Sequence, residues 1–178
     1  MAIHKVTVIP RGQAGGFTMS TPVEDKTYQS RNEMLEEIIV LLGGRAAEEM
    51  WLDDISTGAS SDIERATSIA RQMVKKYGMS TEIGVVSYDE GGEVFIGRDF
   101  GHSKNYSEKT AALIDDAVSE LLNRQYASAK KLLEEYSAQL EAVAQALIEK
   151  ETLDGEDFDR IYNEASASVG NTEVKEEI

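Results

Sequence analysis

The sequence predicts a mainly α-helical fold with a small β ribbon at the N-terminus and a long helical hairpin at the C-terminus. Residues 3–9 alternate apolar and polar side chains, residues 30–33 form a helix-capping motif, and residues 104–153 contain neither glycine nor proline. Period-two alternation is typical of a half-buried strand, and long uninterrupted segments with apolar residues three and four apart are typical of helices. The 178 residues, 41% hydrophobic and 29% charged, have the composition of a packed globular domain.

The N-terminal ribbon is expected to consist of two short extended segments. The first has the sequence I-H-K-V-T-V-I over residues 3–9 and ends at a Pro-Arg-Gly turn. The second covers residues 15–19 and starts with a glycine pair. Because β-branched residues favour strands and a short glycine-containing connection favours a hairpin, we expect the two segments to pair.

A helix is expected to begin after Ser30. Ser30 and Glu33 have the spacing of a capping box, in which each side chain accepts a hydrogen bond from the other residue's amide. The apolar stripe of this helix consists of Leu35, Ile38, Ile39, Leu42, Ala46 and Met50. Gly43 and Gly44 each cost about 1 kcal/mol relative to alanine inside a helix. Either another backbone or a site packs closely against them, or the segment is broken into two short helices.

A second helix is expected to open at Ser60 and Ser61, with Glu64 in its first turn and Gly78 as its C-terminal cap. Its apolar face consists of Ile63, Ala66, Ala70, Met73, Val74 and Tyr77. Residues 83–96 contain several glycines between short apolar runs. We expect loops there, with one or two brief strands.

The C-terminal part carries a heptad seam. Its members are Leu122, Tyr126, Ala129, Leu133, Tyr136, Leu140, Val143 and Leu147. Since a single helix of this length is unusual in a compact domain, two antiparallel helices hinged within residues 134–139 are expected. Residues 155–165 are expected to add a last short helix. The predicted domain therefore covers residues 3–165, and residues 166–178 are expected to form a disordered acidic tail.

Composition narrows the classes of partner. The chain has 33 acidic residues against 18 lysines and arginines, a net charge of −15, which disfavours nucleic acid and anionic lipid surfaces. The absence of cysteine excludes disulfides and thiolate metal sites. No stretch approaches the roughly 20 apolar residues that span a bilayer, so we expect a soluble chain. Because the sequence runs from Met1 directly into the first strand, we expect a piece of a larger protein.

The residues alone do not complete a catalytic site. A catalytic zinc ion takes three protein ligands, and the only histidines, His4 and His102, are too far apart in sequence for an H-E-x-x-H helix. Ser60 and Ser61 are better explained as helix caps than as nucleophiles, because no histidine is placed to activate them. Asp62 lies in the first turn of a helix, where the helix dipole favours an acid by about 0.3–1 kcal/mol whether or not it binds a metal.

Several segments together resemble the peptidase domain of the FtsH family, membrane-anchored and ATP-dependent zinc proteases. They are H-K-V-T-V-I-P-R-G at residues 4–12, G-G-R-A-A-E-E at 43–49, T-G-A-S-S-D-I-E-R-A-T at 57–67, and the later F-I-G-R-D-F and S-E-K-T-A. The resemblance implies a zincin-like fold. It also implies that Asp62 is the third zinc ligand of the complete protein, and that an H-E-A-G-H helix would precede residue 4.

The resemblance assigns further roles in the complete protein. Glu48 would orient a ligating histidine, and the alternative is a solvated helix position. The strand formed by His4, Lys5, Val6, Thr7, Val8 and Ile9 would hold an extended substrate along an unpaired sheet edge, and the alternative is pairing inside the sheet. No catalytic residue is assigned within this chain.

The function implied is that of part of an ATP-dependent zinc metalloendopeptidase that degrades unfolded or membrane proteins. In the family, zinc binds the complete protein, ATP acts through a separate ATPase module, and the protein forms a homo-oligomeric hexamer on the cytoplasmic face of a membrane. This chain by itself is expected to hold no zinc and to be inactive. The alternative is a non-catalytic helical interaction or assembly module related to the family.

Overall fold

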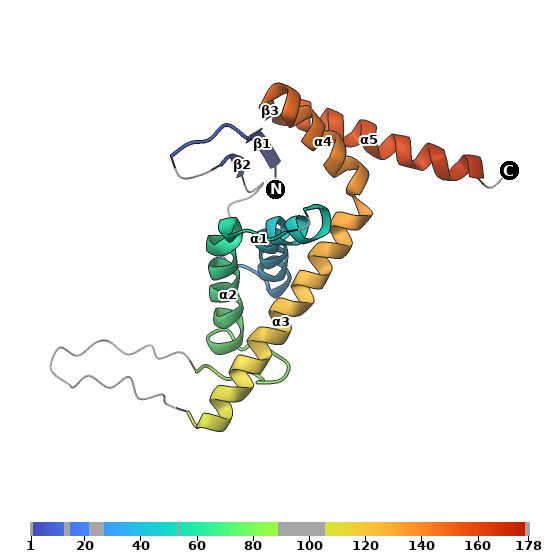
Figure 1. Ribbon diagram of the computed structural model, residues 1–178. Helices are drawn as coiled ribbons and strands as arrows, with labels where there is room; N and C mark the ends of the chain where they lie inside the picture. Colours follow the sequence, from blue (N-terminus) through green and yellow to red (C-terminus); the bar gives the residue numbers. More distant parts are fainter. Residues whose placement is uncertain (1, 13–14, 22–26, 53, 89–105, 177–178) are drawn as a thin grey trace. The chain divides into compact units, whose positions relative to one another are not determined.

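The computed structural model describes residues 2–12, 15–21, 27–52, 54–88 and 106–176, with side chains described as far as residue 167 (Figure 1). The chain forms two compact units. The sheet unit contains Met1–Thr27 and Leu133–Ile178, and the helical unit contains Tyr28–Leu132. The predicted fold class, mainly helical with a small sheet, is confirmed. The expectation of one domain over residues 3–165 stays a prediction.

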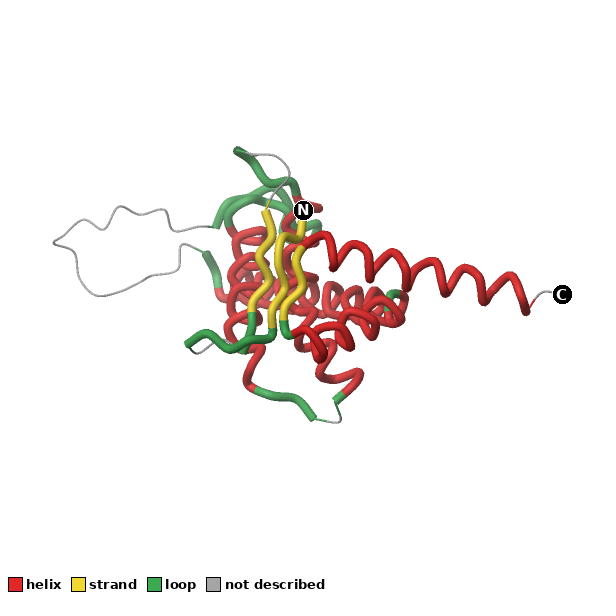
Figure 2. The backbone as a smooth tube through the Cα atoms, turned by 90° about the horizontal axis from the view of Figure 1, so that it is seen from above, coloured by secondary structure: helices red, strands yellow, loops and turns green. Residues whose placement is uncertain are grey.

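The sheet unit contains a three-stranded antiparallel sheet, visible as three yellow strands side by side in Figure 2. Strands β1 (Ala2–Thr7) and β2 (Phe17–Thr21) are the predicted ribbon. The third strand, β3 (Thr152–Asp154), comes from the other end of the chain and was not predicted. The strand order is β2-β1-β3, so β1 is the central strand.

Strand β3 is held against β1 by one buried side chain and by hydrogen bonds to the residue that precedes the strand. Leu153 is fully buried opposite Val6. The Thr7 hydroxyl donates to the Glu151 carbonyl at 3.0 Å, and the Val8 amide donates to the same oxygen at 3.0 Å. Glu151 has a φ of 60°, the left-handed conformation that ends the preceding helix and turns the chain into the strand.

Two helices complete the sheet unit. Helix α4 (Ser137–Lys150) packs against α5 (Gly155–Glu176), and α5 also packs against β1. A hydrogen bond of 3.0 Å from the buried Gln139 amide to the Ser166 hydroxyl joins the two helices. A row of stacked rings adds to the contact: Tyr162 lies 6.4 Å from Tyr136 and 6.1 Å from Phe158, between ring centroids. The helical hairpin at the C-terminus is therefore formed by α4 and α5.

The predicted hinge within residues 134–139 is confirmed, and the antiparallel arrangement of the two helices that it joins stays a prediction. Helix α3 (Glu108–Glu135) ends there and α4 begins after Tyr136. Tyr136 has φ −106° and ψ 27°, which interrupts the helix at a single residue. At Glu151 the chain turns back, so that α5 packs against α4. Helix α5 continues to Glu176, through most of the segment expected to be a tail, whose boundary at residue 166 stays a prediction.

The helical unit begins with α1 (Arg31–Trp51), and the predicted capping box is confirmed. The Glu33 amide donates to the Ser30 hydroxyl at 3.3 Å, and the Ser30 amide donates to the Glu33 carboxylate at 2.7 Å. The helix runs without a break through Gly43 and Gly44, so the alternative of two short helices is wrong. The 3-10 turn η1 (Thr57–Ala59) and helix α2 (Ser60–Lys75) follow.

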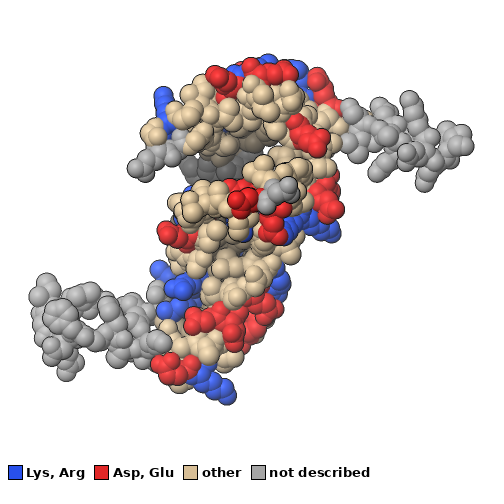
Figure 3. All heavy atoms as spheres, in the orientation of Figure 1, with Lys and Arg blue, Asp and Glu red and all other residues tan. Residues whose placement is uncertain are grey.

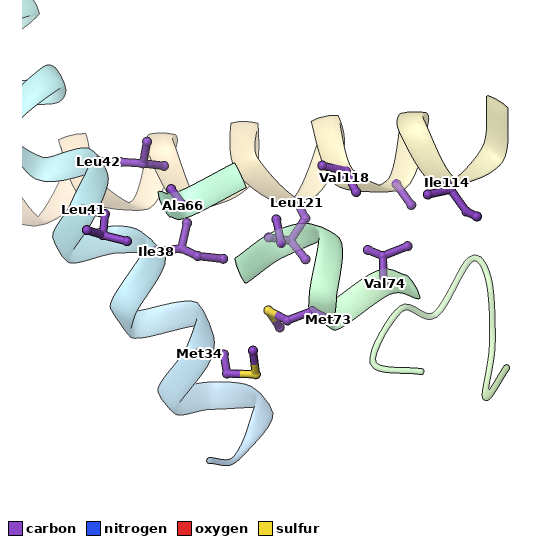
Figure 4. Close-up of a cluster of buried hydrophobic side chains, with 12 residues drawn as sticks. Met34, Ile38, Leu41, Leu42, Ala66, Met73, Val74, Ile114, Val118 and Leu121 are labelled. Carbon is purple, nitrogen blue, oxygen red and sulfur yellow. The ribbon is translucent and has the colours of Figure 1, made fainter. Parts of the chain in front are cut away.

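The core of the helical unit joins α1, α2 and α3 (Figure 4). Its buried members are Met34, Ile38, Leu41, Leu42, Ala66, Ala70, Met73, Val74, Ile114, Ala117, Val118 and Leu121. Ala66 and Ala70 are fully buried on α2, and their small side chains let the larger residues of α1 approach its backbone. Two predicted core positions of α2, Ile63 and Tyr77, are instead exposed.

Helix α2 ends at Lys75 with Lys76 as its C-terminal cap, so the prediction that Gly78 is the cap is wrong. Gly78 follows two residues later and has a φ of +60°. The Met79 amide donates to the Met73 carbonyl at 2.9 Å, and the Tyr88 amide donates to the Lys75 carbonyl at 2.7 Å. These bonds fold the segment after α2 back onto the helix end. Between residues 83 and 88 the structure contains no strand, and the rest of the predicted strand region, 89–96, lies outside the described residues.

Acidic and basic side chains of the described residues lie interspersed on the face seen in Figure 3. Some pair locally, for example Lys150 with Asp157 at 3.0 Å and Arg65 with Glu37 at 3.9 Å. Among the described residues, no helix is both long enough and apolar enough to cross a bilayer.

Replacing Ile38 by alanine tests the core. Ile38 is 0% exposed, so Ile38→Ala is expected to lower the free energy of unfolding by about 2–5 kcal/mol through lost burial and the cavity left behind. Val40 lies two residues away on the same helix and is 70% exposed, so Val40→Ala is expected to change it by less than about 0.5 kcal/mol. Urea denaturation of both variants measures the difference; equal effects would contradict the described core.

Candidate functional site

Asp62 lies in the first turn of α2 and is partly buried. The N-cap position of α2 is Ala59, which has no side chain to accept a hydrogen bond from the helix. The expectation that Ser60 and Ser61 cap this helix is therefore wrong. The capping serine is Ser56, whose hydroxyl accepts a hydrogen bond from the Gly58 amide at 3.1 Å and caps η1, which leads directly into α2.

Glu48 lies in the last turn of α1 and contacts the same turn. Its carboxylate accepts the Ser56 hydroxyl at 2.5 Å and the Ser56 amide at 3.2 Å. These two hydrogen bonds hold the pKa of Glu48 below its ordinary value. Glu48 is therefore not a freely solvated helix position, and the structure brings it to the turn that precedes Asp62.

Glu49, the next residue, makes a different set of contacts. Its carboxylate accepts hydrogen bonds from the Tyr126 hydroxyl and, at 2.5 Å, from the Lys130 ammonium group. Lys130 also lies 4.9 Å above the centre of the Tyr126 ring. Burial, with the hydrogen bond to Glu49, raises the pKa of Tyr126 to about 12. The sequence analysis did not predict this cluster. Tyr126 was assigned only to the heptad seam, and no motif or spacing singled out Lys130.

Arg45, Gly43 and Gly44 of the motif at residues 43–49 take no part in these hydrogen bonds. Arg45 has one guanidinium nitrogen, Nη1, that is buried and makes no hydrogen bond among the described residues. At Gly43 and Gly44, an added Cβ would meet no atom of the described chain within 4 Å. The close packing expected against these glycines is therefore not formed by any described part of this chain.

The residues proposed to bind substrate lie in the sheet unit. His4 is exposed and its Nε2 lies 2.7 Å from the Thr21 hydroxyl. Lys5, Val6 and Thr7 face β2 on one side and β3 on the other. The expectation that this strand is an unpaired edge is therefore wrong, because β3 returns from the C-terminal part to cover it. A role in substrate binding for His4, Lys5, Val6, Thr7, Val8 and Ile9 stays a prediction. His102 lies outside the described residues.

Sequence comparisons identify the family. The model of the family described as Peptidase family M41 matches residues 1–161. The chain is 53% identical over 162 residues to the ATP-dependent zinc metalloprotease FtsH 1 of Thermoanaerobacter sp. (strain X514), covering 90% of this chain and 26% of that protein. This chain belongs to peptidase family M41.

Two further relatives support the same family assignment. The ATP-dependent zinc metalloprotease FtsH 2 of Alkaliphilus metalliredigens is 48% identical over 177 residues, 99% of this chain and 26% of that protein. The FtsH of Bacillus subtilis is 43% identical over 171 residues, 95% of this chain and 27% of that protein. The resemblance to the FtsH family and the zincin-like fold that it implied are confirmed. The chain spans about a quarter of the length of these M41 relatives.

The described residues of this M41 chain contain no group of side chains that could hold a zinc ion. Across the described residues, no three side chains of histidine, cysteine, aspartate or glutamate lie close enough together to hold a metal. A catalytic zinc ion needs three protein ligands and one open position. Asp62 is the one described residue that the family pattern nominates as a ligand, so the remaining ligands of a zinc site would have to come from elsewhere.

Replacing Gly44 by alanine tests whether anything in this chain needs the glycine. Because the position is exposed, helical and open, Gly44→Ala is expected to raise the free energy of unfolding by about 0.5–1 kcal/mol. Gly78→Ala is the control: Gly78 has a φ of +60° and its Cβ would lie 3.1 Å from Val85, so this variant is expected to be destabilised. A loss of stability in Gly44→Ala, measured by urea denaturation, would contradict the open surface.

The raised pKa of Tyr126 predicts a loss of stability in alkali. An unfolded tyrosine loses its proton near pH 10 whereas folded Tyr126 keeps it to about pH 12, so the free energy of unfolding should fall between these values. In Tyr126→Phe the fall should be shallower, and in Tyr28→Phe, which removes an 87% exposed ring, it should match the parent chain. Denaturation at a series of pH values measures the slopes. Equal slopes in the parent and Tyr126→Phe would contradict the assignment.

Proposed function

We propose that this chain is part of an ATP-dependent zinc metalloendopeptidase that degrades unfolded or membrane proteins, and that the chain alone is inactive. Relatives at 43–53% identity carry the name ATP-dependent zinc metalloprotease. The observation that carries the proposal is the place of Asp62, in the first turn of α2 and next to a turn bound by Glu48. The Asp62 carboxylate is partly buried, and the turn before its helix is held by hydrogen bonds to Glu48. A carboxylate held in this way is suited to serve as one ligand of a larger metal site.

Zinc is proposed to bind only in the complete protein. The family pattern implies two histidines on a helix that would precede residue 4, with Asp62 as the third ligand. One carboxylate, without imidazoles beside it, falls short of the ligand number that a catalytic zinc ion requires. The absence of a metal-binding trio among the described residues supports the proposal that this chain holds no zinc tightly.

Substrate is proposed to bind as an extended chain along the sheet that contains β1. Backbone pairing at a sheet edge depends little on side-chain sequence, which suits a protease acting on unfolded polypeptides. Since β1 is paired on both sides, we propose the outer strand β2 as the edge, with residues 4–9 lying on the side of β2 away from the substrate. The Met19 side chain of β2 is half exposed and is available to contact a substrate.

The remaining parts of the proposal concern the complete protein. ATP would act through an ATPase module outside this chain, and the relatives are named ATP-dependent. The complete protein would form a hexamer on the cytoplasmic face of a membrane, attached through segments outside this chain. Unfolded polypeptides are the proposed substrates, and nucleic acid is not a proposed partner because the net charge is −15.

A second candidate function is a non-catalytic helical interaction or assembly module. It is favoured by one observation, the lack of a metal-binding trio in the part of the chain that the structure describes. It differs from the first candidate in needing neither Asp62 nor a metal.

Zinc binding and cleavage distinguish the two functions. Purified chain is expected to lose zinc on dialysis and to leave casein intact, whereas the complete protein should cleave casein until a chelator is added. Asp62→Asn in the complete protein should reduce cleavage more than the roughly 10–100-fold typical of groups that only support a ligand. Glu64→Gln, an exposed acid two residues along the same helix, is the control and should cleave normally. Normal cleavage and zinc content in Asp62→Asn would reject the proposed function.

A further inference from the structure

Helix α2 carries a basic face although the chain as a whole is strongly acidic. Residues 65–81 contain four lysines and arginines and no acidic residue, whereas the net charge of the chain is −15. Arg71 is exposed and Lys75 is partly exposed, one helical turn apart on α2. A hollow of about 540 Å³ is lined by Arg71, Lys75 and Ile63 and, toward the start of the helix, by Glu64. The basic face consists of Ile63, Arg71 and Lys75.

Among the described residues, no acidic side chain forms an ion pair with Arg71 or Lys75. The ion pairs of this part of the chain use other cations, such as Arg65 with Glu37 at 3.9 Å. The Lys75 ammonium group lies 5.6 Å from the centre of the Tyr106 ring, a contact that leaves its charge in place and restrains its side chain. Both cations are therefore open to a carboxylate from a partner.

Helix α3 carries an acidic face. Residues 110–123 contain three acidic residues and no lysine or arginine. Asp116 and Glu120 are exposed, and neither forms an ion pair within the part of the chain that the structure describes. Leu113 is 46% exposed and lies one turn before Asp116, and it adds an apolar side chain as the 39% exposed Ile63 does on α2. The acidic face consists of Leu113, Asp116 and Glu120.

The charges on the two faces have the same spacing. Arg71 and Lys75 are four residues apart, as are Asp116 and Glu120, so the two charges of each face lie about 6 Å apart along the helix axis. Both helices turn other side chains into the core shown in Figure 4, and none of these four residues belongs to it. The four charges therefore lie outside the core, where a second molecule can reach them.

A second copy of this chain is the partner that the two faces fit. Two copies with a net charge of −15 each repel one another, so a stable contact between them has to bring opposite charges together. The basic face of one copy against the acidic face of another does this with two cations and two carboxylates at equal spacing. Every copy carries both faces, so the contact can be repeated from copy to copy.

We propose that copies of this chain associate through a contact between the basic face of one copy and the acidic face of the next. Because the two faces differ, the contact is heterologous, and its repetition gives a closed ring or an open filament. The inference rests on the homo-oligomer of the proposed function and names the surfaces through which its copies meet. It depends on neither a metal ion nor Asp62.

Reversing the charges of each face tests the contact in this chain, with sedimentation velocity over a concentration series as the measurement. Arg71→Glu with Lys75→Glu leaves both faces acidic, and Asp116→Lys with Glu120→Lys leaves both faces basic. Each double variant alone is expected to associate at least about tenfold more weakly than the parent chain, because like charges then meet. An equal mixture of the two variants is expected to associate again, because each basic face then meets an acidic one.

Matched controls separate this contact from an effect of net charge. Arg11→Glu with Lys131→Glu, and Glu134→Lys with Glu141→Lys, change the net charge by the same amounts at exposed positions outside the two faces. Both controls are expected to associate within about threefold of the parent chain. Circular dichroism checks that all four double variants keep the helical fold. A loss of association in the controls as large as in the face variants would overturn the proposal.

Zero-length cross-linking with a carbodiimide tests the pairing directly. The reagent joins an amine to a carboxylate only where the two touch, so a mixture of isotopically labelled and unlabelled chain should give mixed links from Lys75 to Asp116 or Glu120. Links found only within one copy would contradict the contact, as would a mixture of the two face variants that stays monomeric. A parent chain that is monomeric at every concentration would leave the basic face to a different acidic protein and would overturn the proposal.

Asp62→Asn separates this inference from the proposed function. This variant is expected to associate as the parent chain does, because Asp62 belongs to neither face. If Asp62→Asn keeps cleavage in the complete protein, the proposed catalytic function is wrong while the association results are unchanged. If the face variants associate normally while Asp62→Asn loses cleavage, the proposed contact is wrong and the catalytic function stands.

Discussion

The packing of α1 against the alanine face of α2 is the constraint on which the candidate site depends. Ala66 and Ala70 are fully buried on α2, and Ile38 is fully buried on α1. Small side chains at these positions let the two helices approach closely. In this arrangement the carboxylate of Glu48, at the end of α1, reaches Ser56 in the turn before α2. The core of the helical unit thus sets the geometry of its polar contacts.

Glu48 and Glu49 are adjacent on α1 but bind different neighbours because of the helix geometry. Successive residues of an α-helix point about 100° apart, so Glu48 and Glu49 face different neighbours. Glu48 binds the turn that leads to Asp62, whereas Glu49 binds Tyr126 and Lys130 on α3. The two acids of the motif at residues 43–49 therefore join α1 to the turn before α2 and to helix α3.

The sheet unit shows the same dependence on contacts between distant residues. Thr7 and Val8 share the Glu151 carbonyl, and Leu153 closes the sheet beside Val6. Because β3 comes from the C-terminal part and pairs with β1, β1 is the central strand. The two outer strands of the sheet are β2 and β3. A substrate that pairs with this sheet has to do so at an outer strand.

The sequence by itself determined the features that arise from neighbouring residues: the capping box at Ser30, the hinge near Tyr136 and the β1–β2 ribbon. The resemblance of its motifs to those of the FtsH family also pointed to Asp62 and Glu48 as candidate site residues. Tertiary structure alone decided that Leu153 adds a third strand, that Ser56 is the partner of Glu48, and that Tyr126 is the partner of Glu49. The physical reason is range. Helix caps and turns are fixed by dihedral angles and hydrogen bonds a few residues apart, whereas these partners meet only after the helices and strands have packed.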